Sequence, residues 1–253
     1  MNHKTSFLNG SFGVLIDNVT RQDLADKAFQ LEAYETWLNC GGLIAVRGTD
    51  LRNLAPSDLV DWANVFGLVE NKTQTAREDK TVPGFPILRI GNVKDHAGKP
   101  RAQFAIVPKL RDDNDMRYNP STRRPVWHTD STFREFPPIG SVFHCRIAPP
   151  AGGETLFADM RSAYKSLDDK KKGELMKLEA ICSLAHHDKK INAYSPEYPV
   201  LTAEQRKANP PNRVPLVLEH PITKEVALYG LNSSTCAVVP IGENISEIDL
   251  LDE

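Results

Sequence analysis

RRPVWHTDSTF occupies residues 123–133, and GGETLFADM follows at residues 152–160. Between them lie a Pro-Pro pair and the apolar run VFHC at 142–145, which we interpret as a strand with a packed His144. A single residue separates His128 from Asp130, and positions i and i+2 of an extended segment face the same side. An imidazole nitrogen and a carboxylate oxygen can then converge on one ion, which suits a borderline divalent metal.

Spacing alone leaves the meaning of this pair open. The chain has seven histidines, and a second His-x-Asp occurs at His186-His187-Asp188. Two lysines follow that second pair, and like charges beside a cation site are unfavourable, so we interpret it as a surface feature. For His128 and Asp130 the alternative to a metal site is a buried histidine capped by its neighbouring carboxylate.

Composition excludes several classes of protein. The 253 residues carry a formal charge of -2, which gives no electrostatic case for nucleic acid or an anionic membrane. We find no apolar run near the ~20 residues that cross a bilayer and no apolar signal segment at the N-terminus. Four scattered cysteines without a C-x-x-C indicate reduced thiols. We therefore expect a cytoplasmic protein.

Local patterns predict a succession of helices and strands. A helix from Thr20 to Asn39 should place Leu24, Ala28, Leu31 and Trp37 on one face, and Pro56 should begin another, ending near Gly67. Residues 162–167 and 168–178 are also expected to be helical, and 186–215 a long irregular excursion. The predicted strands are 12–16, 43–46, 87–90, 104–107, 180–184, 214–218 and 226–231. This pattern favours an α+β class, with a mainly β core under helical cover.

Several motifs together resemble the taurine dioxygenase and dichlorophenoxyacetate dioxygenase family. WHTDSTF at 127–133, Pro137-Pro138 and GGETLF at 152–157 are similar to its signature. The segments 42–48 and 59–67 are similar to its N-terminal strand and helix, and 219–229 to its His-Pro hairpin. The resemblance covers most of the chain.

This resemblance implies a fold and a chemistry. The fold is a double-stranded β-helix, or jelly roll, in one domain spanning residues 1–253. The activity is that of an Fe(II)- and 2-oxoglutarate-dependent dioxygenase, which uses O2 to hydroxylate a small, anionic organic substrate and releases succinate and CO2. The expected partner is a small molecule, with a homo-oligomer left open.

The same resemblance implies roles for individual residues. His128 and Asp130 become metal ligands, and Thr155 binds a carboxylate of 2-oxoglutarate. Arg124 and Ser131 fall at substrate-contacting positions. For Thr155 the alternative is a hydroxyl that satisfies local backbone, and for Arg124 it is a solvated strand edge. We interpret Trp127 as a core residue.

The family pattern also requires a third ligand histidine and, about ten residues later, an arginine for 2-oxoglutarate. We find neither and expect both beyond Glu253, so the jelly roll and its domain are expected to lack C-terminal strands. His220 is the leading substitute within the chain, although the family's His-Pro position is structural. The alternative functions are an inactive binding module and a metal-binding β-barrel of another class.

Overall fold

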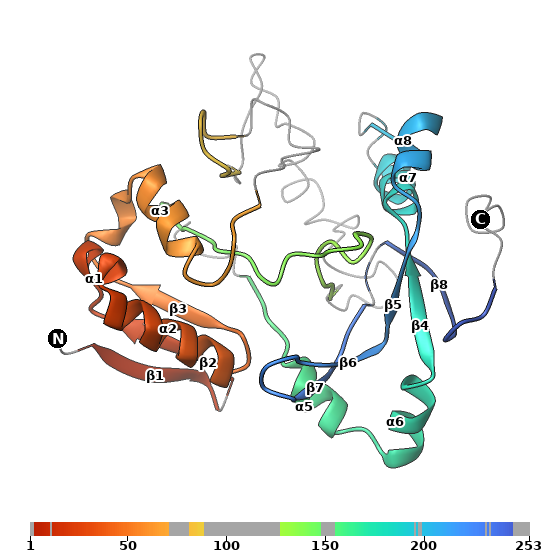
Figure 1. The fold of residues 1–253 in the computed structure, drawn as a ribbon, viewed down its shortest axis with the longest axis horizontal. Coiled ribbons are helices and arrows are strands. Elements are labelled where there is room, and N and C mark those ends of the chain that lie inside the picture. Colours follow the sequence, from red (N-terminus) through yellow and green to blue (C-terminus); the bar gives the residue numbers. More distant parts are fainter. Residues whose placement is uncertain are drawn as a thin grey trace. The chain divides into compact units, whose positions relative to one another are not determined.

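The computed structural model describes residues 3–10, 12–70, 81–88, 127–147, 155–194, 196, 199–230, 232 and 234–244 (Figure 1). The chain forms two compact units, each with its own core. The first comprises Met1–Arg89 and Pro138–Asp159, and the second comprises Ile90–Pro137 and Met160–Glu253. The predicted strand at 104–107 and the substrate candidate Arg124 lie outside the described residues.

The first unit is built on a three-stranded sheet in the order β1-β2-β3. β1 (Lys4–Asn9) runs antiparallel to β2 (Phe12–Asp17), which runs parallel to β3 (Ile44–Arg47). The strands predicted at 12–16 and 43–46 are thus confirmed, whereas β1 was not predicted. All six β1 residues are exposed, so this edge strand shows no apolar alternation from which to predict it.

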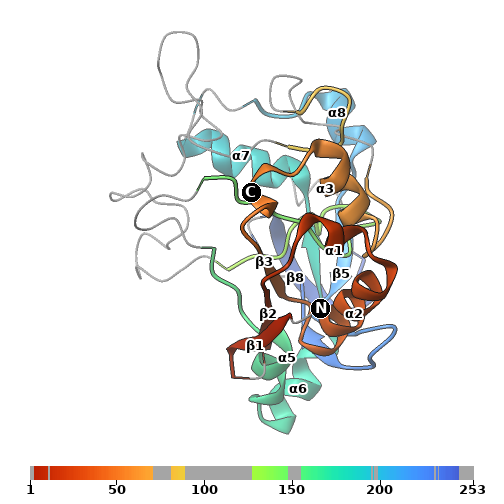
Figure 2. The ribbon, with the colours of Figure 1, turned by 90° about the vertical axis from the view of Figure 1, so that its left-hand side faces the viewer.

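Helices cover one face of this sheet (Figure 2). They are α1 (Arg21–Ala25), α2 (Lys27–Asn39) and α3 (Pro56–Ala63), and a 3-10 turn spans Leu51–Asn53. The Thr20 hydroxyl accepts the Asp23 N–H, and the Asp23 carboxylate accepts the Thr20 N–H, which confirms a helix start there. The single predicted helix is broken at Asp26, whose side chain caps α2 by accepting the Phe29 N–H.

The buried face of α2 differs from the predicted one. Phe29 and Ala33 are buried, whereas Leu31 is 58% exposed. Phe29 stacks on Trp62 with ring centroids 5.9 Å apart, so the break at Asp26 turns α2 to pack its aromatic residue against α3. Gly48 closes β3, as predicted: a Cβ there would lie 1.6 Å from the carbonyl oxygen of Val19, so only glycine fits.

The second unit contains a three-stranded antiparallel sheet in the order β5-β4-β8. Its strands are β4 (Leu178–Cys182), β5 (Asn212–Pro215) and β8 (Thr235–Pro240). β4 confirms the strand predicted at 180–184, two residues earlier, and lies in the centre, paired to both neighbours. The core of this unit consists of Ala180, Cys182, Val214 and Leu216, with Phe133 and Tyr229 packed against it.

A separate two-stranded hairpin joins β6 (Val217–Glu219) to β7 (Val226–Leu228), as the sequence predicts. In its turn the His220 Nδ1 accepts the N–H groups of Ile222 and Thr223, at 3.3 and 3.1 Å. His220 therefore stabilises the turn, which agrees with the structural role of the family's His-Pro position and not with metal binding.

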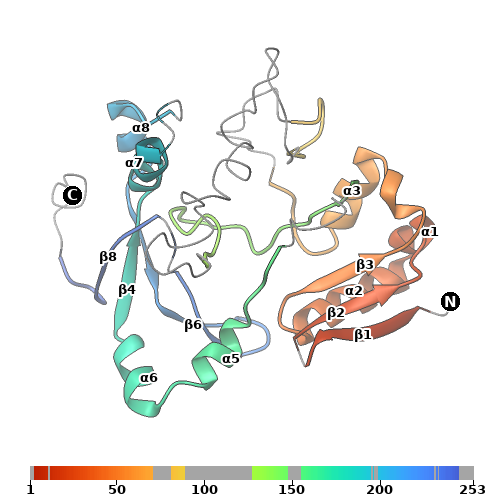
Figure 3. The ribbon, with the colours of Figure 1, turned by 180° about the vertical axis from the view of Figure 1, so that it is seen from behind.

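Within the described residues, the second unit contains the helices α5 (Met160–Lys165), α6 (Asp169–Leu175), α7 (Leu184–Tyr194) and α8 (Ala203–Ala208). Figure 3 shows α7 and α8 at one end of β4 and α6 at the other. Asp168 caps α6 by accepting the Lys171 N–H at 2.7 Å, as predicted. The irregular excursion predicted for 186–215 is wrong, because most of α7 and all of α8 and β5 lie within it.

The described residues thus form an α+β structure of sheets with helices against them. In the described part of the second half, the helices α5 to α8 lie among the strands β4 to β8. Within 81–88 the chain makes an isolated bridge between Thr81 and Leu88, and the last two residues of the strand predicted at 87–90 lie outside the described residues. No helix in the described ranges combines the length and the apolar character that crossing a membrane requires.

Candidate metal centre

The His128 and Asp130 side chains meet as predicted, on a backbone that differs from the predicted one. The segment is irregular up to Thr129, and a turn begins at Asp130 in place of an extended strand. Ser131 has φ +59°, and the Arg134 N–H donates to its carbonyl at 3.0 Å. The His128 Nε2 lies 3.0 Å from the Asp130 Oδ1. The two donors therefore converge directly before and at the start of this turn.

Both donors are accessible to solvent, and the Asp130 carboxyl is in the ionisation state that metal binding favours. The side chains of His128 and Asp130 are 60% and 65% exposed, which contradicts the alternative of a buried, capped histidine. The hydrogen bond from His128 lowers the pKa of Asp130, although burial acts in the opposite direction. The carboxylate is therefore ionised at neutral pH, as a metal ligand must be.

A second histidine lies in the electrostatic neighbourhood of this pair. His187, on α7, is half-buried, and burial followed by the nearby His128 lowers its pKa. Asp188 beside it is only 5% exposed, so the surface interpretation of His186-His187-Asp188 is wrong. Among the described residues no group of three His, Cys, Asp or Glu side chains is arranged to hold a metal ion. The chemistry of His128 and Asp130 fits two ligand positions of an Fe(II) ion.

The turn after Asp130 is held by side-chain amides from distant parts of the second unit. The Asn212 Nδ2 donates to the carbonyls of Thr132 and Arg134, at 2.9 and 2.7 Å. The Asn232 Nδ2 donates to the Thr129 carbonyl and the Thr132 hydroxyl, both at 2.6 Å. Sequence reasoning missed both asparagines, because no local pattern links them to residues about 80 to 100 positions away.

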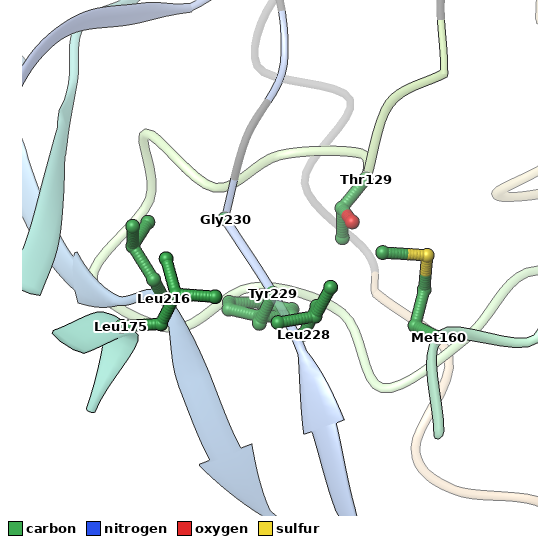
Figure 4. Close-up of a pocket in the computed structure, with 7 residues that line it drawn as sticks. All are labelled: Thr129, Met160, Leu175, Leu216, Leu228, Tyr229 and Gly230. Carbon is green, nitrogen blue, oxygen red and sulfur yellow. The ribbon is translucent and has the colours of Figure 1, made fainter. Parts of the chain in front are cut away.

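An apolar cavity of about 110 Å³ lies beside Thr129 (Figure 4). The Thr129 side chain points into it, and the other walls come from α5, α6, the hairpin and the residue that precedes the hairpin. Thr129 thus faces the hydrocarbon interior while its neighbours His128 and Asp130 present polar atoms to solvent. The residues around the cavity are Thr129, Met160, Leu175, Leu216, Leu228, Tyr229 and Gly230.

The other predicted site residues in the described part of the chain differ in their exposure and in the unit to which they belong. Thr155 is exposed and belongs to the first unit, whereas His128 and Asp130 belong to the second. Ser131 is half-buried in the turn. Trp127 is 49% exposed, so its interpretation as a core residue is wrong.

His144 is packed, as predicted, but not in a strand. Residues 141–145 are irregular, and Val142 and Phe143 are exposed. The His144 Nε2 lies 2.8 Å from the Leu51 carbonyl oxygen, and this contact within the first unit holds the imidazole. Within the described residues the four cysteines are free thiols, as the sequence indicates.

Comparisons with known proteins agree on one family. Residues 11–252 match the model of the taurine catabolism dioxygenase TauD, TfdA family. The chain is 27% identical over 184 residues to an (S)-phenoxypropionate/alpha-ketoglutarate-dioxygenase of Sphingobium herbicidovorans, covering 73% of this chain and 54% of that protein. It is 29% identical over 245 residues to an alpha-ketoglutarate-dependent sulfonate dioxygenase of Saccharomyces cerevisiae, covering 96% and 53%. The chain spans about half the length of these two relatives.

The fold is similar to that of solved proteins. The crystal structure of AAD-2 in complex with Mn(II) and N-oxalylglycine matches all of this chain and 79% of its own, with a TM-score of 0.64 and 21% identity. The His-x-Asp segment lies inside the region that the family model covers, so the motif, its geometry and the similarity of the whole sequence agree. The chain belongs to the taurine catabolism dioxygenase TauD, TfdA family.

Proposed function

We propose that this chain acts as an Fe(II)- and 2-oxoglutarate-dependent dioxygenase that hydroxylates a small, anionic organic molecule. The observation that carries the proposal is the pair His128 and Asp130, with nitrogen and oxygen donors 3.0 Å apart, exposed and within the family match. The relatives support the substrate class, because their names specify phenoxypropionate, 2,4-dichlorophenoxyacetate and sulfonate, all of them anions.

In this proposal the metal would be held by the His128 imidazole and the Asp130 carboxylate. Bound Fe(II) supplies the activation of O2, coupled to the conversion of 2-oxoglutarate to succinate and CO2. Asp130 contributes a negative charge that the low pKa of its carboxyl maintains at neutral pH. The turn at Ser131 directs this carboxylate back toward the imidazole, so the protein supplies ligand orientation before metal arrives.

The other predicted residues have roles in the same proposal. Thr155 donates a hydrogen bond to a carboxylate of 2-oxoglutarate, and its exposed hydroxyl is accessible for this. Arg124 and Ser131 contact the substrate, Arg124 through a charge-assisted hydrogen bond to its anionic group.

For the fold, we propose one domain with a double-stranded β-helix that includes both compact units. The similarity to the solved AAD-2 structure supports this proposal.

Metal titration tests the ligand assignment. Co(II) binding is measured by calorimetry on the wild-type chain and on the variants His128→Ala, Asp130→Ala and His220→Ala. His220 is the matched control, because its imidazole accepts two backbone N–H groups in the hairpin turn. We expect the first two variants to lose Co(II) binding and His220→Ala to retain it. Wild-type affinity in His128→Ala or Asp130→Ala contradicts the assignment.

Turnover tests the reaction. With Fe(II), ascorbate and 2-oxoglutarate, we expect succinate from the wild-type chain and none from Asp130→Ala. Adding phenoxyacetates, phenoxypropionates and alkyl sulfonates in turn should raise succinate formation with the preferred class. If the chain binds Co(II) through His128 and Asp130 but forms no succinate, this result contradicts the proposed dioxygenase activity. One that also holds zinc and ignores 2-oxoglutarate indicates a metal-binding protein of another class.

A further inference from the structure

His128 precedes a turn that begins at Asp130, and neither residue lies in a strand, so no sheet ladder fixes the spacing between them. Only Thr129 separates His128 from Asp130, and the peptide groups on either side of it determine where both side chains point. A fixed Thr129 carbonyl therefore restricts both donors together. We propose that Asn232 is a positioning residue for the metal pair, because its side-chain amide holds that carbonyl; this inference rests on the proposed function.

The Asn232 amide makes a hydrogen bond with every polar atom it has. Its Nδ2 donates one hydrogen to the Thr129 carbonyl and the other to the Thr132 hydroxyl, both at 2.6 Å. Its Oδ1 accepts the Ser234 N–H at 2.7 Å and the Ser234 hydroxyl at 2.6 Å. Ser234 thus determines which end of the amide is oxygen, and the donor end faces the metal pair.

Three side chains close a ring of hydrogen bonds behind the turn. Asn232 donates to Thr132, Ser234 donates to Asn232, and the Thr132 hydroxyl lies 3.2 Å from that of Ser234. Since the Ser234 hydrogen is already directed at Asn232, Thr132 is the donor in this last contact. Thr132 is fully buried and Ser234 is 2% exposed, so water does not compete for these bonds.

The ring is anchored in the central sheet of the second unit. The Ser234 carbonyl accepts the Ser183 N–H at 2.8 Å, directly after β4. The Asn232 N–H donates to the Thr235 hydroxyl at 3.1 Å, and Thr235 begins β8. Asn232 is therefore held by the paired ends of β4 and β8. Its hydrogen bond to the Thr129 carbonyl in turn restricts the position of that carbonyl. A partner that orients a metal ligand in this way affects metal affinity by about 10- to 100-fold.

Asn212 provides a matched control within the same turn. Its Nδ2 also donates to two backbone carbonyls, those of Thr132 and Arg134, but both lie after the metal pair. Asn212→Ala removes the same type of side chain, with two hydrogen bonds against the four that Asn232→Ala removes. The two variants differ in whether the lost bonds hold the peptide between His128 and Asp130.

The experiment measures two quantities for each variant: the Kd for Co(II), and the urea midpoint of the metal-free chain. We expect Asn232→Ala to raise the Kd by about 10- to 100-fold. Asn212→Ala should lower the urea midpoint by less than Asn232→Ala, because it removes fewer hydrogen bonds, and should leave the Kd near the wild-type value. Ser234→Ala, which leaves the Asn232 amide in place without one of its orienting bonds, should raise the Kd by a smaller factor.

Each outcome supports or contradicts the positioning role. A Kd in Asn232→Ala that changes no more than in Asn212→Ala overturns it, because general loosening of the turn then accounts for both. If Asn232→Ala does not fold, an unchanged Kd in Ser234→Ala overturns it instead. A wild-type chain without Co(II) affinity overturns the proposed function and this inference with it, whereas normal wild-type binding with an unaffected Asn232→Ala overturns the inference alone.

Discussion

The same substitution at two threonines of one turn should have different effects on stability. Thr129 and Thr132 flank the start of the turn, and replacing either by valine keeps the branched shape while exchanging the hydroxyl for a methyl group. Their surroundings differ: the Thr132 hydroxyl lies inside the ring with Asn232 and Ser234. The Thr129 side chain points into the apolar cavity (Figure 4). A comparison of the two variants therefore separates the effect of lost hydrogen bonds on stability from the effect of side-chain packing.

For Thr132→Val we expect a loss of unfolding free energy. The residue is fully buried, so the valine methyl leaves the Asn232 N–H and the Ser234 oxygen without a partner and without access to water. A buried polar group left unsatisfied costs about 1–3 kcal/mol, so the variant should lose stability in that range. The loss should fall at the upper end if both orphaned groups remain desolvated.

For Thr129→Val we expect no loss. The hydroxyl makes no hydrogen bond within the described part of the chain and faces leucine and methionine side chains. A methyl group there adds apolar contact, which is worth at most about 0.8 kcal/mol. Urea unfolding followed by circular dichroism and tryptophan fluorescence measures both variants, in a chelating buffer so that metal binding does not add to stability. Equal losses in the two variants, or a larger loss in Thr129→Val, refute the reasoning.

Three further outcomes follow from particular contacts. Asp168→Ala removes the N-terminal cap of α6 and should lower the unfolding free energy by about 1 kcal/mol in urea titrations. Leu216→Ala deletes a side chain that is 4% exposed and already borders a cavity, so it should cost about 2–5 kcal/mol by the same measurement. The hydrogen bond from Arg47 holds the pKa of Asp17 at about 2, below its ordinary 3.8. Because that pKa is lowered on folding, its contribution to stability is present above pH 3.8 and is lost as the pH falls toward 2. Arg47→Gln should return the pKa toward 3.8 in an NMR titration and remove this dependence.

Signals between neighbouring residues could be predicted from the sequence. Thr20, Pro56 and Asp168 begin helices as expected, because a cap depends only on the three or four residues that follow it. Asp26 was missed, although it caps its helix in the same way as Thr20. Both cap by accepting an N–H three residues later, but an aspartate inside a long apolar pattern gives no indication that the helix breaks there.

Strands defined by their partners were harder to predict than helices. β4 and the β6–β7 hairpin have apolar runs and a turn, and both were found. β1 has no buried residue, and its pairing with β2 uses backbone groups that every sequence possesses. β8 follows a polar stretch, and its position in the sheet depends on pairing with β4, a strand more than fifty residues earlier in the chain. β1 lacks an apolar alternation, whereas β8 contains a short apolar run at 236–239 that was overlooked.

The metal pair shows how a correct prediction can rest on the wrong local structure. Spacing predicted convergence of His128 and Asp130 through a flat strand, which would bring its own ladder of hydrogen bonds. The structure reaches the same convergence through a turn at Asp130, and a turn has no ladder. The restriction that the hydrogen bonds of a strand would place on the two side chains must therefore come from other residues. Asn232, 103 residues after Thr129, supplies it from the edge of another sheet. Residue types identified the two donors, whereas their arrangement depends on the folded β4–β8 pair, which no motif at residues 127–133 encodes.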